Sequence, residues 1–425
     1  MFVSLPAIEL EIHKLIAFER YNDALVNILM SVNRHYKLPD VARNFLYYPR
    51  FDRQIQQLSD VLVATGAPTL PRAITDNTLI IASELYQVGG HSRVIADLAR
   101  EVPSPTIVVT DAFSKYRDTP VNLSWILDAF EDVSLIVLPQ PGLWAKSRAL
   151  SLLTQRLQPR SILYFNHHQD PVPFVGTLGH VGSRKTLVHH CDHNPCLGVT
   201  LAGVDHVDFT EELAQTCATQ LNFAPQILPL YVPDAGKRQF APLGNNGFSV
   251  VTSGTHVKFA RTGELALQNI AQTVLDNVRG LFFHIGSIEG EWVAEIRSHL
   301  ELNRIDPRRF APLGPVPSLW DALGKLDGHL YLGSAPDGGG RAAIEAQGCG
   351  YPVAFFRANQ PGPIQEVDSL YADKQLGWSN LVELSALLRA FWPQQARLSE
   401  EARAFYDERF SRGPFVRALN RITGA

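Results

Sequence analysis

Short apolar runs alternate with helical segments along most of this chain, and the alternation occurs twice. The first series begins near Thr78 with "TLIIAS" and continues through "TIVVTD", "VSLIVLP", "SILYFNHH" and "KTLVHHCDH". Buried strands separated by helices favour a parallel sheet with helices on both faces. A stretch rich in Pro and Gly, from Pro233 to Gly247, interrupts the pattern. The alternation then restarts with "FSVVTSG" and runs through "GLFFHIGS", "GHLYLG" and "YPVAFF".

The repetition predicts two doubly wound, Rossmann-like domains joined by a linker. A chain of 425 residues, 45% of them hydrophobic, is long enough to bury two large cores. The region before the first strand is expected to be helical, because Leu25, Ile28, Leu29 and Val32 recur at the spacing of one helix face. We therefore expect an α/β fold in four parts: an N-terminal helical extension (1–72), a first domain (73–235), a second domain (236–395) and C-terminal helices (396–425).

The charge balance argues against a nucleic-acid partner. The chain has 38 Lys and Arg against 42 Asp and Glu, for a net charge of −4. A nucleic-acid-binding domain is normally strongly basic, and none of its motifs occurs here.

The cysteines and the N-terminus predict a cytoplasmic protein. Four cysteines without a CxxC pair do not make a disulfide framework, so a reducing compartment is expected. The first residues, "MFVSLPAIELEIHKL", lack the basic and apolar regions of a signal peptide. No apolar run approaches the roughly 18 residues that span a bilayer. Peripheral attachment at the inner face of a membrane stays compatible with this interpretation.

Three consecutive glycines, Gly338, Gly339 and Gly340, lie between a predicted strand and a predicted helix. A helix N-terminus offers free N–H groups and about half a positive charge, and glycine lets a phosphate come close to them. Glu345 lies farther along the same helix, where its carboxylate could reach a ribose diol. The alternative is a tight packing turn followed by a solvated glutamate.

From about residue 75 onward the chain resembles glycosyltransferases of the GT-B type. It is most similar to their large retaining, nucleotide-sugar-dependent family. In that family a glutamate on a helix binds the nucleotide ribose, and the helix continues in a motif similar to "EAQGCGYPV" here. The resemblance therefore implies that Glu345 binds the ribose. The family often carries another glutamate eight positions earlier. This chain has Asp337 there, and the resemblance implies that its shorter side chain acts on the donor sugar.

Two further stretches extend the resemblance. "ELYQVGGHSRVIADLA" is similar to the family's first loop, which implies that Gly89, Gly90 and His91 lie next to donor and acceptor. "VVTSGTHVKFARTGE" occupies the place of the loop that presents basic residues to the diphosphate, and this implies donor-binding roles for Lys258 and Arg261. Together with the glycine loop, these residues would neutralise the departing diphosphate without a metal.

Histidines gather at two successive predicted strand ends, "FNHHQD" and "VHHCDHNPC". A zinc site and purely structural hydrogen bonding are both alternatives, although the spacing matches no standard zinc pattern. The favoured interpretation is a polar acceptor site in which His167 and His190 bind substrate. His193 or Asp192 would act there as the base, and no metal is expected.

These residues predict a glycosyltransferase of polysaccharide or glycoconjugate biosynthesis. The first domain would bind a glycan, lipid-linked glycan or protein acceptor, and the second a nucleotide-sugar co-substrate, with the chemistry in a cleft between them and no other cofactor. The helical region before the resemblance also occurs ahead of the GT-B core in cytoplasmic protein N-glycosyltransferases, which invert and form a rival subclass. A nucleotide-sugar epimerase and a non-catalytic nucleotide-binding module are the alternatives from other classes. The sequence leaves the sugar, the base and the oligomeric state open.

Overall fold

The computed structural model describes residues 5–35, 38, 47–66, 73–86, 90–118, 130, 133–189, 195–221, 223, 225–238, 247–358 and 368–424. The chain divides into two compact units, with the division between Pro229 and Leu230. The C-terminal end from Val416 groups with the first unit. Residues 233–238, the described start of the expected linker, contain no helix or strand.

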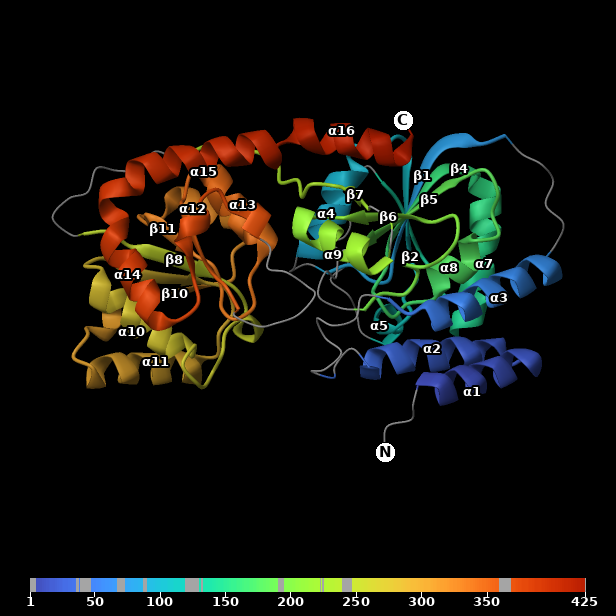
Figure 1. Ribbon diagram of the computed structural model, residues 1–425, viewed down its shortest axis with the longest axis horizontal. Coiled ribbons are helices and arrows are strands. Elements are labelled where there is room, and N and C mark those ends of the chain that lie inside the picture. The colour runs from blue at the N-terminus through green and yellow to red at the C-terminus, as the bar shows by residue number, and fades with distance from the viewer. Residues whose placement is uncertain are drawn as a thin grey trace. The chain divides into compact units, whose positions relative to one another are not determined.

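The described part of the first unit contains one parallel sheet of seven strands in the order β3-β2-β1-β4-β5-β6-β7 (Figure 1). The strands are β1 (Thr75–Ala82), β2 (Pro105–Val109), β3 (Ser134–Val137), β4 (Pro159–Phe165), β5 (Arg184–His189), β6 (Asp205–Asp208) and β7 (Gln226–Ile227). Leu79, Ile80 and Ile81 of β1 are completely buried. A continuous apolar run is typical of a strand covered on both faces, and this explains "TLIIAS".

Helices of the first unit connect these strands. They are α4 (Gly90–Ala99), α5 (Lys115–Asp118), α7 (Leu143–Leu157), α8 (Val172–Thr177) and α9 (Glu211–Leu221). The connection from β1 to β2 and the connection from β4 to β5 run toward opposite edges of the sheet, because β1 and β4 are neighbours. This arrangement confirms the expected doubly wound fold.

The N-terminal helices α1 (Leu5–Ala17), α2 (Tyr21–His35) and α3 (Pro49–Thr65) belong to the first unit. The apolar face predicted for α2 is confirmed, since Leu25, Ile28, Leu29 and Val32 are all buried. These helices share one hydrophobic core with the sheet, and α2 and α3 pack on α7 and α8 (Figure 1). The helical extension is thus a layer of this unit.

A buried carboxylate also ties the helical layer to the segment between β5 and β6. Asp52 on α3 accepts hydrogen bonds from the backbone N–H of Gly198 at 2.7 Å and of Thr200 at 2.9 Å, and from Thr200 Oγ1 at 2.6 Å. Burial raises the pKa of Asp52 to about 6, although these three hydrogen bonds act in the opposite direction.

The described part of the second unit repeats the design with six parallel strands in the order β10-β9-β8-β11-β12-β13. They are β8 (Val250–Ser253), β9 (Phe282–Ile285), β10 (Phe310–Gly314), β11 (Leu330–Leu332), β12 (Val353–Phe356) and β13 (Gly377–Trp378). Gly286 follows β9 with φ +136°, and a Cβ there would lie 2.1 Å from the carbonyl oxygen of Gly254. Only glycine allows the backbones to approach so closely.

Helices of the second unit cover both faces of this sheet (Figure 1). The α-helices are α10 (Leu267–Asn277), α11 (Gly290–Leu302), α12 (Leu319–Lys325), α13 (Gly340–Cys349), α14 (Leu381–Phe391) and α15 (Gln395–Arg409). Short 3-10 helices are η1 (His256–Lys258), η2 (Pro307–Arg309), η3 (Asp368–Leu370), η4 (Lys374–Leu376) and η5 (Trp392–Gln394). The last helix, α16 (Arg412–Thr423), ends in the first unit, where Ser161 Oγ donates to the Thr423 carbonyl at 2.8 Å.

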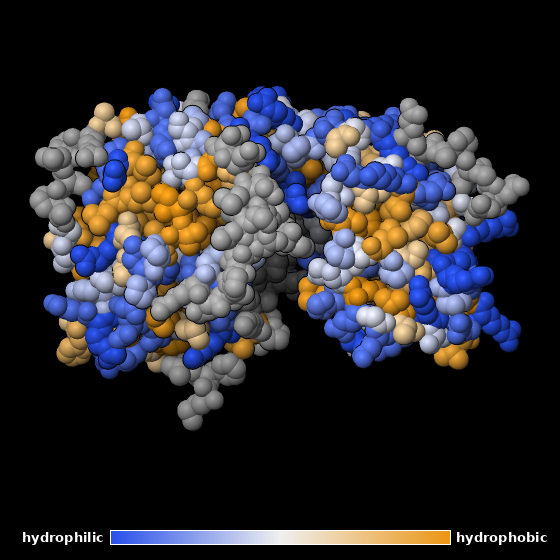
Figure 2. Space-filling view, turned by 180° about the vertical axis from the view of Figure 1, so that it is seen from behind, coloured by the Kyte–Doolittle hydropathy of each residue, from blue (hydrophilic) through white to orange (hydrophobic). Residues whose placement is uncertain are grey.

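Polar and apolar residues both reach the surface of each unit, as Figure 2 shows for one face. Exposed large apolar side chains of the described residues include Phe18 directly after α1, Leu302 at the end of α11 and Val382 on α14. None of the described helices combines the length and the apolar character needed to cross a membrane.

Candidate active site

Both sheets reverse their winding between two neighbouring strands. In the first unit these strands are β1 and β4, and in the second they are β8 and β11. In doubly wound folds, ligands bind outside the carboxyl ends of the strands at this switch point. The loops that follow these four strands therefore contain the candidate site residues of each unit.

In the second unit, the loops after β8 and β11 are joined by a lysine. Lys258, at the end of η1, donates a hydrogen bond from Nζ to the Gly338 carbonyl oxygen at 3.2 Å. The structure thus brings together two of the predicted donor-binding elements, a cation and the glycine loop. The loop leads into α13, for which Gly339 is the N-cap and Gly340 the first residue. The Lys258 ammonium group therefore contacts the backbone at the residue just before the N-cap of α13.

Neither the backbone conformation nor the packing requires glycine at positions 338 and 339. Neither Gly338 nor Gly339 has a left-handed φ. An added Cβ would lie 3.8 Å from Tyr371 Oη at position 338 and 3.6 Å from Ala342 Cβ at position 339, both ordinary contacts. A ligand held close to the backbone N–H groups would explain these glycines.

Glu345 lies on α13 and forms an ion pair with Arg341 of the same helix, with Nε and Oε1 3.1 Å apart. The two side chains are only 14% and 15% exposed, so this is a largely buried pair. Burial and then the Glu345 charge raise the pKa of Tyr331 on β11, whose hydroxyl lies 2.6 Å from Ser253 Oγ at the end of β8. The carboxylate therefore belongs to the polar surroundings of the switch point.

Two other predicted donor residues lie apart from this arrangement. Arg261 uses its guanidinium to bind Glu289 at 3.1 Å and Glu295 at 2.9 Å, and it lies over the ring of Trp292. A contact with a diphosphate would require Arg261 to leave both carboxylates. Asp337 is exposed, and its backbone carbonyl accepts a hydrogen bond from Ser334 Oγ at 2.7 Å. The roles inferred for these two side chains stay predictions.

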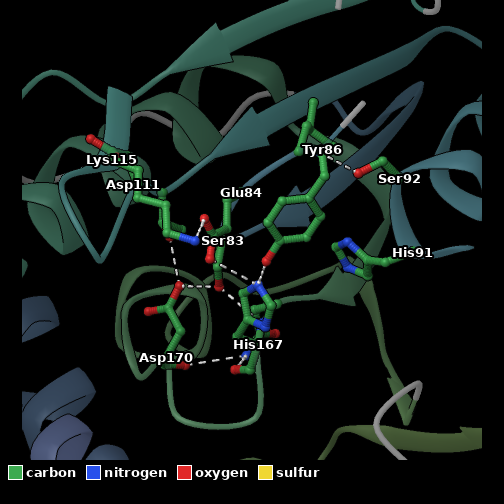
Figure 3. A network of polar contacts seen from close by, with 12 residues as sticks. Ser83, Glu84, Tyr86, His91, Ser92, Asp111, Lys115, His167 and Asp170 are labelled. Carbon is green, nitrogen blue, oxygen red and sulfur yellow. Dashed lines mark hydrogen bonds and ion pairs between the residues drawn. The ribbon is translucent and has the colours of Figure 1, made fainter. Parts of the chain in front are cut away.

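In the first unit, a charged cluster occupies the switch point (Figure 3). Glu84, two residues after β1, binds Lys115 Nζ at 2.6 Å and His167 Nε2 at 3.2 Å. The hydroxyl of Tyr86 hydrogen-bonds His167 Nε2. Glu84 and Tyr86 follow β1, Lys115 is the first residue of α5 after β2, and His167 follows β4. Figure 3 shows the Glu84 and Tyr86 side chains pointing toward the His167 ring.

The electrostatics of this cluster keep Glu84 ionised. Burial by itself raises the pKa of Glu84, but hydrogen bonds from His167, Lys115 and Tyr86 outweigh it and lower this pKa to about 2. His91 behaves in the opposite way, because burial and then the nearby His167 lower its pKa to about 4. Its Nε2 donates to the Phe165 carbonyl at 2.8 Å, so a neutral His91 stacks beside His167, with ring centroids 5.7 Å apart.

A second, fully buried carboxylate braces the loops below this cluster. Asp170 accepts hydrogen bonds from Ser83 Oγ at 2.7 Å, from Thr110 Oγ1 at 2.6 Å and from the Val172 N–H at 2.9 Å. Ser83 Oγ in turn accepts from the His167 N–H at 2.9 Å. Burial raises the pKa of Asp170, and these hydrogen bonds oppose the effect. The network fixes the backbone from which His167 projects.

The structure brings together the predicted His91 and His167, and it makes Gly90 the first residue of α4. Four other predicted residues, Gly89, His190, Asp192 and His193, lie outside the described residues.

The sequence interpretation missed Glu84 and Tyr86, which contact His167, and Lys115, which pairs with Glu84. A signal for them existed, because each lies within a few residues of a predicted strand end, where binding residues of such sheets gather.

Sequence comparison assigns the chain to no family. No protein-family model matches it, and no curated protein matches it by sequence.

Solved structures, in contrast, resemble it over most of its length. The match to a mutant of the Thermobaculum terrenum O-GlcNAc transferase covers 98% of this chain and 81% of the transferase chain, with a TM-score of 0.55 and 15% sequence identity. A Rickettsia africae ESF-5 glycosyltransferase covers 82% of this chain and 98% of its own, at a TM-score of 0.61 and 13% identity.

A third similar structure is a mutant of TarM from S. aureus, in complex with Fondaparinux, alpha-GlcNAc-glycerol and UDP. It covers 83% of this chain and 100% of its own, at a TM-score of 0.59 and 12% identity. Likeness at such identities concerns the fold, and the expectation from the sequence is confirmed at that level. The chain has the GT-B fold of these glycosyltransferases, two parallel sheets flanked by helices.

Proposed function

We propose that this chain is a glycosyltransferase that takes its sugar from a nucleoside diphosphate sugar bound by the second unit. The observation that carries the proposal is the hydrogen bond from Lys258 Nζ to the Gly338 carbonyl, 3.2 Å long. It holds a cation beside the N-terminus of α13, at the switch point of a doubly wound sheet. A departing diphosphate carries concentrated negative charge, and fixed donors at this place would stabilise it as the sugar leaves.

The donor is proposed to carry a uridine nucleotide. The similar TarM structure, which matches 83% of this chain, is a complex with UDP. Glu345 is placed on the helix that would receive the diphosphate, so its carboxylate could accept the two ribose hydroxyls. Binding would then redistribute the contact between Glu345 and Arg341.

The acceptor, a glycan, lipid-linked glycan or protein, is proposed to bind the first unit. There an ionised Glu84 holds His167, and a histidine oriented by a carboxylate is suited to remove a proton from a hydroxyl. Inverting transfer needs such a base. The Asp at position 337, in place of the usual glutamate of the retaining family, points the same way. We therefore propose inversion at the anomeric carbon.

Ligand-induced thermal stabilisation tests the donor site first. UDP should raise the melting temperature in proportion to the logarithm of its concentration, whereas uridine should have little effect, because the proposed site holds the diphosphate. Equal stabilisation by both ligands, or by neither, would contradict the proposal.

Turnover then separates the classes of enzyme. With a panel of UDP-sugars, a transferase should release UDP faster when an acceptor is added, and NMR of the product reports the anomeric configuration. Release of an altered nucleotide-sugar without acceptor would identify an epimerase. Binding without any turnover would identify a non-catalytic module.

A further inference from the structure

Four buried side chains of the first unit converge outside the candidate active site. They are His189, His206, Asp208 and Cys217, and each is at most 5% exposed. One ligand atom from each, a ring nitrogen, a carboxylate oxygen or the sulfur, lies within 4.8 Å of all the others. The proposed donor and acceptor residues include none of them.

The fold places these side chains together for simple reasons. His189 is the last residue of β5, and it is paired in register with Asp208, the last residue of β6. His206 and Asp208 lie two positions apart on β6, so their side chains project from the same face of the sheet. Cys217 lies on α9, which packs on β6. The cluster therefore joins two strands and the helix that follows them.

The spacing of the four groups suits a tetrahedral ion. Zinc bonds of about 2.0–2.1 Å to nitrogen or oxygen and about 2.3 Å to sulfur separate tetrahedral ligand atoms by roughly 3.3–3.6 Å. Asp208 Oδ1 lies 3.2 Å from His189 Nδ1 and 3.1 Å from His206 Nε2. Cys217 Sγ lies 3.7 Å from His189 Nδ1. Three edges of the expected tetrahedron are thus present within about 0.2 Å.

Hydrogen bonding alone accounts poorly for this cluster. A single carboxylate oxygen, Asp208 Oδ1, serves both imidazole rings. Asp208 Oδ2 and His206 Nδ1 are buried and have no hydrogen-bond partner within the described part of the chain. A buried carboxylate with an unpartnered oxygen is costly. A divalent cation would change this balance, because one carboxylate and one thiolate neutralise it while the two imidazoles stay neutral.

We propose that His189, His206, Asp208 and Cys217 bind one divalent metal ion, and the ligand set of two imidazoles, a carboxylate and a thiolate favours zinc. Four protein ligands leave no open position, so the site is structural. It would fasten β5, β6 and α9 at the point where the chain continues into residues 190–194. That segment contains the predicted Asp192 and His193, which lie outside the described residues.

This site differs from the one that the histidine-rich sequence suggested. The segment "HHCDHNPC" shares only His189 with it, and the other ligands follow 17, 19 and 28 positions later, at 206, 208 and 217. Sequence spacing could not indicate the site, because the strand pairing of β5 with β6 creates it.

Metal analysis of the full-length, tag-free protein tests the proposal directly. Protein purified from zinc-supplemented culture and dialysed should contain about one zinc ion per chain. X-ray absorption at the zinc edge should show one sulfur and three nitrogen or oxygen ligands. After replacement by cobalt, a thiolate charge-transfer band should appear in the near ultraviolet. Removal of the metal with a chelator should lower the melting temperature.

Cys217→Ser and Asp208→Asn should reduce the zinc content to background. Cys349→Ser, which removes a buried thiol of the second unit, is the matched control and should keep the full content. A wild-type protein that holds no zinc and is not stabilised by added zinc would overturn the proposal. So would zinc without a sulfur ligand, or zinc that persists in Cys217→Ser and disappears in His193→Ala. The wild-type measurements remain decisive even if the variants fail to fold.

Discussion

Lys258 and Gly338 lie 80 positions apart in the sequence, and Lys258 Nζ donates a hydrogen bond to the Gly338 carbonyl at 3.2 Å. The bond connects the loop after β8 with the loop after β11, the two strands between which the second sheet reverses its winding. It sets a cation beside the start of α13. The predictions below begin from this relationship and extend to the first unit.

Lys258→Ala should weaken binding of UDP by about one to two decades in dissociation constant. A charge-assisted hydrogen bond is worth roughly 1.5–3 kcal/mol, and the free nucleoside, which has no diphosphate, should be affected little. Isothermal titration of UDP and uridine measures both effects. Lys325→Ala is the control. Lys325 is exposed at the end of α12 and precedes β11, so it lies toward the amino ends of the strands, away from the loops that follow β8 and β11. Equal losses for UDP and uridine would assign Lys258 a role in stability.

Gly338→Ala combined with Gly339→Ala should leave the free energy of unfolding within about 0.5 kcal/mol of wild type, because both Cβ atoms fit. UDP affinity should nevertheless fall by about tenfold or more, because a methyl group would obstruct a diphosphate at the backbone N–H groups. Gly290→Ala makes the same change at the start of α11, where space is open, and should alter neither quantity. A double variant that binds UDP normally would leave the two glycines without a ligand role.

Glu345→Gln should lower donor affinity by about 1–3 kcal/mol, because the amide is a weaker acceptor for the ribose hydroxyls. A 2′-deoxy UDP-sugar should show a similar loss with the wild type and little further loss with the variant, since both changes remove one contact. The alternative is that Glu345 only positions Arg341, its ion-pair partner. In that case the two losses would add in the double-mutant cycle.

Glu84→Gln should reduce kcat on the order of 100-fold while UDP affinity stays unchanged. Glu84 is a positioning residue here, because it holds His167 and Lys115 through its charge. Glu11→Gln, an exposed change on α1, is the control. An unchanged kcat would exclude the first-unit cluster from the chemistry.

Asp52 predicts a pH dependence of stability. Burial raises its pKa to about 6 in the folded state, above the usual 3.8, so the folded protein binds this proton more tightly than the unfolded chain does. The stabilisation is complete below pH 3.8 and is lost as pH rises through about 6, a difference of roughly 3 kcal/mol. Denaturant unfolding between pH 4 and pH 7 should show this fall in wild type, and Asp52→Asn should remove that part of it. A wild-type curve that rises throughout this range would show that the three hydrogen bonds keep Asp52 ionised.

The sequence by itself determined the class of fold and the neighbourhood of the site. Strands and helices follow from local patterns of apolar residues. The strand at "TLIIAS" and the amphipathic face of α2 can each be recognised from a few neighbouring residues. A strand end followed by glycine and lysine is equally local, which is why Lys258 and Gly338 could be predicted. Strand β10, in contrast, was missed, because Pro312 and Gly314 interrupt its apolar pattern.

The tertiary structure decided which side chains meet. The pairing of β1 with β4 puts Glu84 next to His167, and the packing of α11 gives Arg261 two carboxylates in place of the glycine loop. The pairing of β5 with β6 likewise assembles the cluster around Asp208. Such contacts depend on the order of strands in a sheet, which is fixed by long-range pairing and by the burial of whole helices. Local sequence patterns carry no information about that order, so only the folded chain could show these partners.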